Sequence, residues 1–278
     1  MARPFLPAGV ERPDFYLAAM GRSGSTMICN WLTDAPDQLV FIEPSFLSLP
    51  NTRLLRIQLD HFGMAASDAE WAIQDQTAEA RFQRLMSRRL ARKRWGLKEV
   101  LCSEHRFAIE RLMPRRVVIS ARNIGDVALS FFEKHRLQGN LNRFDDQWVV
   151  DYCIREAAGL VALRMELEAG SLPFAIVRYE DFTRSEDSRQ EIADFISWRG
   201  GGPTAAQFDR FDRSFEVERH GSGVSAHIRT EAERDLGQAE RELASHIARQ
   251  CEEYQRVFGY QLDIYSNVNN SDEFVCYQ

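Results

Sequence analysis

The chain alternates short apolar runs with longer stretches in which hydrophobic residues recur at helical spacing. The apolar runs have the length and the β-branched or aromatic content of buried strands. They lie at 15–20, 39–42, 95–100, 117–121 and 174–177. Helical spacing is found from about 25 onward, within 67–94, around 130, at 144–168 with a break near Gly159, at 186–198, and at 231–258 with a capping Gly259.

This alternation predicts an α/β fold with a mostly parallel central sheet flanked by helices. A length of 278 residues and a hydrophobic content of 44% are enough for one large core. We therefore expect a single domain over 1–278, with terminal extensions at 1–12 and about 262–278. The clearest break is the Gly-Gly-Gly-Pro stretch at 200–203. In such folds ligands bind at the carboxyl ends of the strands, so polar residues at these ends are candidate site residues.

The first strand ends in a short loop of small polar residues with one arginine, Gly21-Arg22-Ser23-Gly24-Ser25-Thr26. Backbone N–H groups of such a loop converge on one point, with the positive end of a helix dipole behind them. Glycines allow close approach, hydroxyls add donors, and the guanidinium adds charge. The loop predicts a phosphate or sulfate site; the alternative is a plain Gly/Ser turn between a strand and a helix.

A second candidate anion site follows the fourth strand. Arg122 stands at the end of that strand, and Ser130 lies two turns into the next helix. A guanidinium fork and a hydroxyl are suited to holding a second phosphate. The Walker pattern is absent, because Gly21 and Gly24 are too close together and no lysine precedes Ser25.

These motifs resemble those of sulfotransferases that use 3′-phosphoadenosine 5′-phosphosulfate (PAPS). Arg22-Ser23-Gly24-Ser25-Thr26 looks like their 5′-phosphosulfate loop, and the stretch from Arg122-Asn123 to Ser130 looks like their 3′-phosphate motif. Arg178-Tyr179-Glu180-Asp181-Phe182 resembles their Tyr-Glu-Asp segment, and the three motifs occur in the family's order. The resemblance spans roughly residues 14 to 260 and implies a P-loop-NTPase-like fold.

The resemblance also implies how the donor, and its product 3′,5′-adenosine bisphosphate (PAP), are bound. The expected 5′-phosphosulfate site comprises Arg22, Ser23, Gly24, Ser25, Thr26 and Met27. Arg122 and Ser130 would bind the 3′-phosphate. Tyr179 would either lie along the adenine or simply pack, and Arg219 and Gly221 loosely resemble the loop that closes over the 3′-phosphate. These groups can neutralise the donor phosphates, so no metal is required.

Glu43 is the expected general base. It follows the second strand in a Glu-Pro step, which many carbohydrate-modifying sulfotransferases share; the alternative is a carboxylate that caps a turn or pairs with an arginine. Lys98 occupies a position where the family often has a lysine, and we expect it to assist at the sulfonate. The histidine that follows this lysine in arylsulfotransferase-like members is replaced here by Glu99 and Val100, which leaves Glu99 as a reserve base. His135 and His227 are further candidates to face the substrate.

We therefore expect in-line transfer of a sulfonate group to a hydroxyl acceptor. A carbohydrate or glycoconjugate is favoured, and a hydroxylated lipid or secondary metabolite is the second choice. Two other functions remain open from the residues alone. A small-molecule kinase on a similar fold would need ATP and Mg²⁺, and a non-catalytic nucleotide- or sulfate-binding module would be indifferent to Glu43.

The net charge, the apolar runs and the cysteine content argue against several other classes of protein. A net charge of −6 argues against a general binder of nucleic acids or anionic membranes. The sequence contains neither the apolar core of a signal peptide nor a run long enough to span a membrane, so a cytoplasmic protein is expected. The five scattered cysteines include no C-x-x-C pair, which favours free thiols over a disulfide framework or zinc. The oligomeric state is not encoded in any recognisable pattern.

Overall fold

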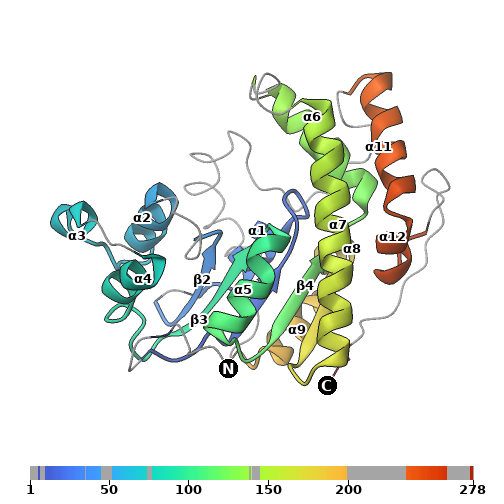
Figure 1. Ribbon diagram of the computed structural model, residues 1–278. Coiled ribbons are helices and arrows are strands. Elements are labelled where there is room, and N and C mark those ends of the chain that lie inside the picture. Colours follow the sequence, from blue (N-terminus) through green and yellow to red (C-terminus); the bar gives the residue numbers. More distant parts are fainter. Residues whose placement is uncertain are drawn as a thin grey trace.

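A six-stranded sheet with helices on both faces forms the centre of the molecule (Figure 1). The computed structural model describes residues 6, 10–34, 36–44, 52–73, 77–137, 139, 145–198, 236–261 and 276–277. The strands are β1 (Phe15–Ala18), β2 (Gln38–Ile42), β3 (Arg94–Glu99), β4 (Val117–Ala121), β5 (Phe174–Arg178) and β6 (Cys276–Tyr277).

The sheet has the order β2-β3-β1-β4-β5-β6. The first five strands run parallel, and β6 pairs antiparallel with β5 at the edge. The predicted α/β fold with a mostly parallel sheet is therefore confirmed. Because β1 lies between β3 and β4, the loop that follows β1 opens at the point where the strand order reverses, which is the usual place for a ligand.

Helices fill the connections between strands. In the first half of the chain they are α1 (Ser25–Leu32), α2 (Thr52–His61), α3 (Asp68–Ala72), α4 (Ala78–Met86) and α5 (Cys102–Leu112). In the second half they are α6 (Ile124–Leu137), α7 (Asp146–Ala169), α8 (Tyr179–Arg184), α9 (Glu186–Phe195), α11 (Gln238–Gln250) and α12 (Glu252–Val257). Among the helices of the described ranges, none combines the length and apolar character needed to cross a bilayer.

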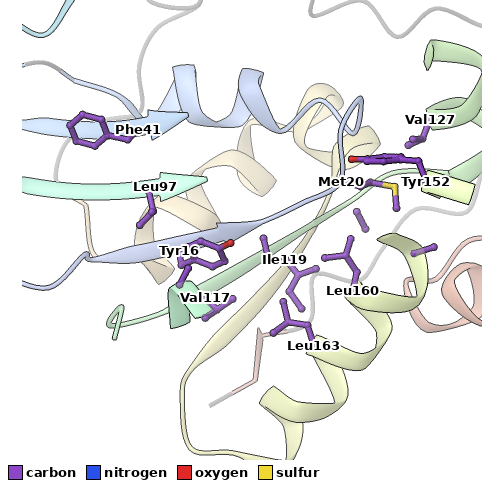
Figure 2. Close-up of a cluster of buried hydrophobic side chains, with 14 of the residues drawn as sticks. Tyr16, Met20, Phe41, Leu97, Val117, Ile119, Val127, Tyr152, Leu160 and Leu163 are labelled. Atoms are coloured by element: carbon purple, nitrogen blue, oxygen red, sulfur yellow. The ribbon is translucent and has the colours of Figure 1, made fainter. Parts of the chain in front are cut away.

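Successive strand residues point to opposite faces of the sheet and thereby enter two separate cores. Tyr16 and Ala18 of β1 belong to a large core that also includes residues of α5, α6, α7, α11 and α12. Figure 2 shows part of this core, with Tyr16, Met20 and Tyr152 among its labelled side chains. Phe15 and Leu17 enter a smaller core on the other face, with residues of α1 and α9.

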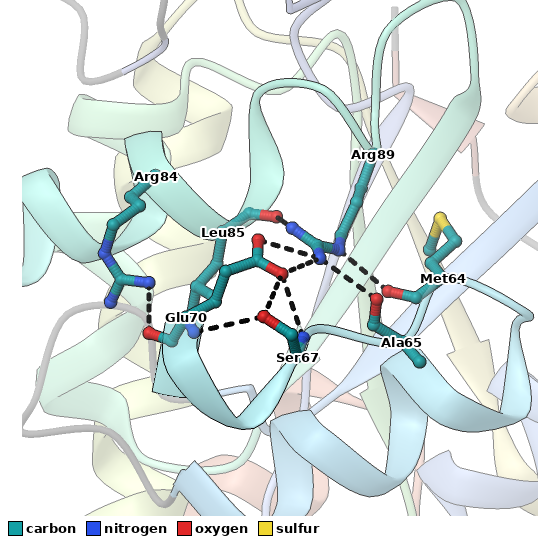
Figure 3. Close-up of polar contacts among 7 residues, drawn as sticks. All are labelled: Met64, Ala65, Ser67, Glu70, Arg84, Leu85 and Arg89. Carbon is teal, nitrogen blue, oxygen red and sulfur yellow. Dashed lines mark hydrogen bonds and ion pairs between the residues drawn. The ribbon is translucent and has the colours of Figure 1, made fainter. Parts of the chain in front are cut away.

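Arginine side chains tie together the segment between β2 and β3. Glu70 and Ser67 form a capping box at the start of α3. The Arg89 guanidinium donates to both Glu70 carboxylate oxygens, at 3.0 and 3.1 Å, and to the carbonyls of Met64 and Ala65 (Figure 3). These contacts anchor α3 to the end of α4.

Two predicted helix features are wrong. The expected break near Gly159 does not occur, because α7 runs unbroken from Asp146 to Ala169. Gly159 is instead a contact position, since a Cβ atom there would lie 2.2 Å from Cβ of Cys102 at the start of α5. The expected long helix at 231–258 is divided at Cys251 into α11 and α12 within the part that the structure describes. The Gly-rich break at 200–203 lies outside the described residues.

Candidate functional site

The parallel register brings the carboxyl ends of five strands to one edge of the sheet. The loop 19–24 follows β1, Glu43 follows β2, and Arg122 follows β4. Lys98 lies at the end of β3, opposite Ile42. Tyr179 begins α8 directly after β5. Residues that are far apart in the sequence, and that the motifs singled out, thus share this edge.

The loop after β1 has the backbone conformation of an anion-binding turn. Arg22 and Gly24 have positive φ values of 65° and 80°, and Gly24 is the N-cap residue of α1. The first N–H groups of a helix have no intrahelical acceptor, so Ser25 and Thr26 offer theirs to a ligand. Two amides of the predicted set are already used within the chain: Ser23 N–H donates to the Met20 carbonyl at 3.3 Å and Met27 N–H to the Gly24 carbonyl at 2.9 Å.

Tyr179 packs on this loop. A Cβ atom at Gly24 would lie 2.1 Å from the Tyr179 ring, so only glycine leaves room for the ring there. The ring is buried, and the Arg122 guanidinium carbon lies 4.5 Å from its centroid. Tyr179 thus packs against the loop and against Arg122, and its role beside the adenine stays a prediction.

The two predicted anion-binding motifs are in direct contact. Arg22 Nε donates to the Ser130 hydroxyl at 3.1 Å, although the two residues are 108 positions apart. Arg122 Nη1 donates to the Arg22 carbonyl at 3.2 Å. Two guanidinium groups and a hydroxyl therefore gather around one loop, which is an arrangement suited to a ligand with more than one anionic group.

Two buried polar atoms at this place have no protein partner among the described residues. They are Nε of Arg122 and the hydroxyl oxygen of Ser23. A buried donor without an acceptor is costly, and such groups are rare unless a ligand or water satisfies them. Both atoms fit an anionic ligand bound between the two motifs.

Glu43 and Lys98 form a close pair beside the loop. Lys98 Nζ lies 2.6 Å from Glu43 Oε1 and 3.4 Å from the Thr26 hydroxyl. The Lys98 side chain is 1% exposed, whereas that of Glu43 is 22% exposed. The ammonium group is thus buried and compensated by a carboxylate that still reaches solvent, an arrangement in which removal of either partner is costly.

The backbone of Glu43 is held in an unusual conformation. Its φ value is +46°, which is uncommon for a residue with a side chain. The Glu43 N–H donates to the Lys98 carbonyl at 2.7 Å. On the outer side of the strand, the Gln58 amide accepts from Ile42 N–H at 2.6 Å and donates to the Ile42 carbonyl at 2.9 Å. Gln58, from α2, therefore pairs the last outward-facing backbone groups of the edge strand.

The reserve candidates lie elsewhere. Glu99 follows Lys98 in the strand and so points to the opposite sheet face, where it is buried. Burial of Tyr16 raises the pKa of its hydroxyl, and the nearby Glu99 raises this pKa further. His135 is buried against Phe131 and Trp148. Arg219, Gly221 and His227 lie outside the described residues.

Several contacts at the site had no local signal in the sequence. The Gly21 N–H donates to the Tyr152 hydroxyl of α7 at 2.7 Å. The Arg122 backbone is bound by the Tyr254 hydroxyl of α12. Both pairings cross more than a hundred residues, so only the folded chain reveals them.

A partly buried carboxylate supports the backbone of the second motif. Glu180 accepts from Asn123 N–H at 3.1 Å and from the Tyr260 hydroxyl at 2.8 Å. Burial raises the pKa of Glu180, and the nearby Arg122 opposes this shift. Gly259 caps α12 as predicted, with φ +74°, and the Tyr260 N–H donates back to the Gln255 carbonyl at 2.7 Å, which brings Tyr260 toward Glu180.

Neither a metal-ligand cluster nor a disulfide is found among the described residues. No group of three or more His, Cys, Asp and Glu side chains there is placed to hold a metal ion. Cys29, Cys102, Cys153 and Cys251 are free thiols. Burial raises the pKa of Cys29, beside Lys98 and Glu43, to about 12.

Comparison with known proteins identifies the fold. No protein-family model matches the chain, and no curated protein matches it in sequence. The structure is similar to a sulfotransferase from Alicyclobacillus acidocaldarius, with a TM-score of 0.53 at 14% identity over 91% of this chain and 98% of that chain. It is also similar to the sulfotransferase STF9 from Mycobacterium avium, with a TM-score of 0.54 at 17% identity over 93% of this chain and 79% of that chain.

A third similar structure is the sulfotransferase domain from the curacin biosynthetic pathway, with a TM-score of 0.53 at 12% identity over 91% of this chain and 99% of that chain. At these sequence identities the structural similarity shows the fold alone, and the chemistry has to be argued from the residues. The chain has the fold of these sulfotransferases, as the sequence motifs led us to expect.

Proposed function

We propose that this protein is a sulfotransferase that moves a sulfonate group from PAPS to a hydroxyl group of an acceptor. The observation that carries the proposal is the contact between the two anion-binding motifs, through Arg22, Ser130 and Arg122. A donor with a 5′-phosphosulfate and a 3′-phosphate has the two anionic groups that such a paired site requires. Arg122 Nε, which has no partner among the described residues, and the similarity in fold to sulfotransferases support the same donor.

Each motif has a defined role in this proposal. Arg22 and the Ser25 and Thr26 amides at the start of α1 bind the 5′-phosphosulfate, with the Ser23, Ser25 and Thr26 hydroxyls as further donors. Arg122 and Ser130 hold the 3′-phosphate. When bound, PAPS supplies an activated sulfonate on a good leaving group. By analogy with phosphoryl transfer, positioning and charge neutralisation by the protein account for most of the acceleration.

Glu43 takes the proton from the acceptor hydroxyl, and the sulfonate is transferred in line. The partial exposure of Glu43 lets the carboxylate reach a substrate, and the pairing with Lys98 fixes the direction of the Glu43 side chain. Lys98, which also contacts the Thr26 hydroxyl, lies between the base and the donor loop and assists at the sulfonate. Both residues project from strand ends, so their separation is set by the sheet register.

A hydroxyl of a carbohydrate or glycoconjugate is the proposed acceptor. The Arg-Ser-Gly-Ser-Thr loop followed by Glu43-Pro44 supports this choice, because it resembles the carbohydrate-directed and related bacterial sulfotransferases. A hydroxylated lipid or secondary metabolite is the second class to be screened.

The test is a transfer assay with PAPS carrying a labelled sulfonate. Purified protein is incubated with panels of sugars, glycoconjugates, hydroxylated lipids and phenols, and labelled product and PAP are measured together. We expect equal amounts of PAP and sulfonated product with at least one hydroxyl acceptor, without added metal. Phosphorylated product from ATP and Mg²⁺, with no sulfonation, would instead identify a kinase. Nucleotide binding without turnover on any panel would favour a binding module.

A further inference from the structure

Two tyrosine hydroxyls support the two halves of the candidate donor site from the same side of the molecule. Tyr152 comes from α7 and Tyr254 from α12, and both belong to the large core. Neither residue belongs to the recognised motifs. Each one binds main-chain atoms of a motif residue rather than its side chain.

Tyr152 joins the donor loop to the end of β3. Its hydroxyl accepts from Gly21 N–H at 2.7 Å and donates to the Val100 carbonyl at 3.0 Å. The ring is fixed by stacking on Trp148, with centroids 5.1 Å apart, and by an edge contact with Phe131 at 4.9 Å. A Cβ atom at Gly21 would lie 2.9 Å from the hydroxyl, so the loop approaches Tyr152 as closely as a glycine permits.

Tyr254 performs the corresponding task at Arg122. Its hydroxyl accepts from Arg122 N–H at 3.2 Å and donates to the Arg122 carbonyl at 3.0 Å. Its ring packs against Phe258, with centroids 4.7 Å apart. The hydroxyl thus occupies both backbone groups of the residue that follows β4 and carries the second guanidinium.

We propose that Tyr152 and Tyr254 are positioning residues that act independently, Tyr152 on the 5′-phosphosulfate loop and Tyr254 on the 3′-phosphate motif. This inference rests on the proposed function, since it assigns each hydroxyl to one anionic group of the donor. It predicts that the loss of either hydroxyl weakens recognition of one end of the nucleotide and leaves the other end unaffected.

The chemistry of the two hydroxyls suits this role. Burial raises the pKa of both tyrosines, so each stays protonated and can donate and accept at once. Deleting a single oxygen leaves a backbone N–H and a carbonyl without their partner, with little change in volume. The loop or the strand end can then shift, while the ring keeps the helix packed in place.

The test uses Tyr152→Phe and Tyr254→Phe in calorimetric titrations with three nucleotides: PAP, 5′-AMP and 3′-AMP. We expect Tyr152→Phe to raise the Kd of PAP and 5′-AMP by about fivefold to tenfold, with the Kd of 3′-AMP unchanged. We expect Tyr254→Phe to do the reverse, raising the Kd of PAP and 3′-AMP with that of 5′-AMP unchanged. A merely structural role would weaken all three ligands alike.

Tyr16→Phe is the matched control. It also removes a buried hydroxyl from the large core, but that hydroxyl bonds His105 at 2.7 Å and touches neither motif. We expect this variant to bind all three nucleotides as the wild type does. Provided that the wild type binds PAP, two results would overturn the inference. One is an equal loss of affinity for all three nucleotides in Tyr152→Phe or Tyr254→Phe, and the other is no loss of affinity in these variants.

A measurement without ligand separates this inference from the proposed function. Amide hydrogen exchange should speed up around 19–24 in Tyr152→Phe only, and around 120–126 in Tyr254→Phe only. If the wild type binds no nucleotide, the proposed function fails and the donor assignment fails with it, whereas the exchange pattern still decides whether each hydroxyl holds its own segment. Unchanged exchange in both variants would contradict the positioning role outright.

Discussion

At the scale of single residues, strained backbone is found in the candidate site. Arg22 and Glu43 are two of five described non-glycine residues with positive φ. Such conformations persist only where the surroundings impose them. Glu43 is held by the Lys98 carbonyl, by the Lys98 side chain and, through Ile42, by Gln58. These constraints direct the carboxylate that we assign as the base.

Replacing the proposed base should abolish turnover without loss of the donor. We expect Glu43→Gln to lower kcat by about 100-fold or more, because an amide cannot accept the acceptor proton. The amide oxygen can still accept from Lys98, so PAP affinity should stay close to wild type, whereas the melting temperature should fall because the buried Lys98 ammonium loses its compensating charge. Steady-state kinetics beside PAP titration measure both effects.

Glu110→Gln is the matched control for that experiment. Glu110 lies in an exposed pair with Arg106 on α5, 2.9 Å apart, and exposed pairs contribute little. It should leave kcat unchanged. A Glu43→Gln enzyme with wild-type turnover would remove Glu43 from the role of base.

Removing the Arg122 guanidinium should weaken the binding of nucleotides that carry a 3′-phosphate more than the binding of those that lack it. We expect Arg122→Ala to weaken PAP by about 10- to 100-fold, because a charge-assisted contact is lost, and to weaken 5′-AMP much less. Competitive titration of the two ligands measures the difference. Equal losses for PAP and 5′-AMP would argue against a 3′-phosphate clamp.

At the scale of elements, the end of the edge strand β2 depends on α2. Gln58 is buried, and its amide satisfies both outward-facing backbone groups of Ile42, next to Glu43. We expect Gln58→Met to lower kcat by about tenfold, since the strand end loses two hydrogen bonds and Glu43 loses its alignment. Donor affinity should remain, because the anion loop follows β1, whereas the lost hydrogen bonds are at the end of β2.

Gln255→Met provides the comparison. Gln255 is also buried, but its amide atoms have no partner within the described part of the chain. Its replacement should leave kcat unchanged and should not lower stability, since no hydrogen bond is lost. If both variants reduced kcat equally, the effect of Gln58 would be one of core packing and not of strand alignment.

The helices and strands also show which features of the fold and the candidate site could be predicted from the sequence. The five parallel strands and the contact between the two anion motifs follow from runs that end in Gly21, Glu43 and Arg122, because parallel strands place their carboxyl ends together. The prediction of a helix break at Gly159 was wrong because that glycine allows close packing against Cys102. No local sequence pattern encodes this contact. Tyr152 and Tyr254 were equally invisible, since each acts on a residue more than a hundred positions away.

At the scale of the whole molecule, the C-terminal helices complete the site. Arg136 of α6 pairs with Glu240 of α11 at 3.8 Å, and Ala244, Ile247 and Ala248 of α11 lie in the large core. This packing carries α12 to the strand ends, where Tyr254 and Tyr260 meet Arg122 and Glu180. The candidate site is therefore built from both ends of the chain.

The core contains a histidine that should make stability depend on pH. Burial lowers the pKa of His105 from 6.5 to about 4, so the folded protein favours its neutral form. The associated stability is present above pH 6.5 and is lost as pH falls toward 4, by about 3 kcal/mol in total. Denaturant unfolding should therefore show a steeper loss between pH 6.5 and 4 in the wild type than in His105→Gln. Parallel curves for the two proteins would contradict this assignment.

The central claim is that the two motifs form one site for a nucleotide with anionic groups at both its 5′ and 3′ ends. Calorimetric titration of the wild-type protein with PAP, beside 5′-AMP and ATP with Mg²⁺, tests this claim most directly. The account predicts binding of PAP in the micromolar range without metal, with a strong preference over 5′-AMP. Absence of PAP binding, or a preference for ATP with Mg²⁺, would contradict it.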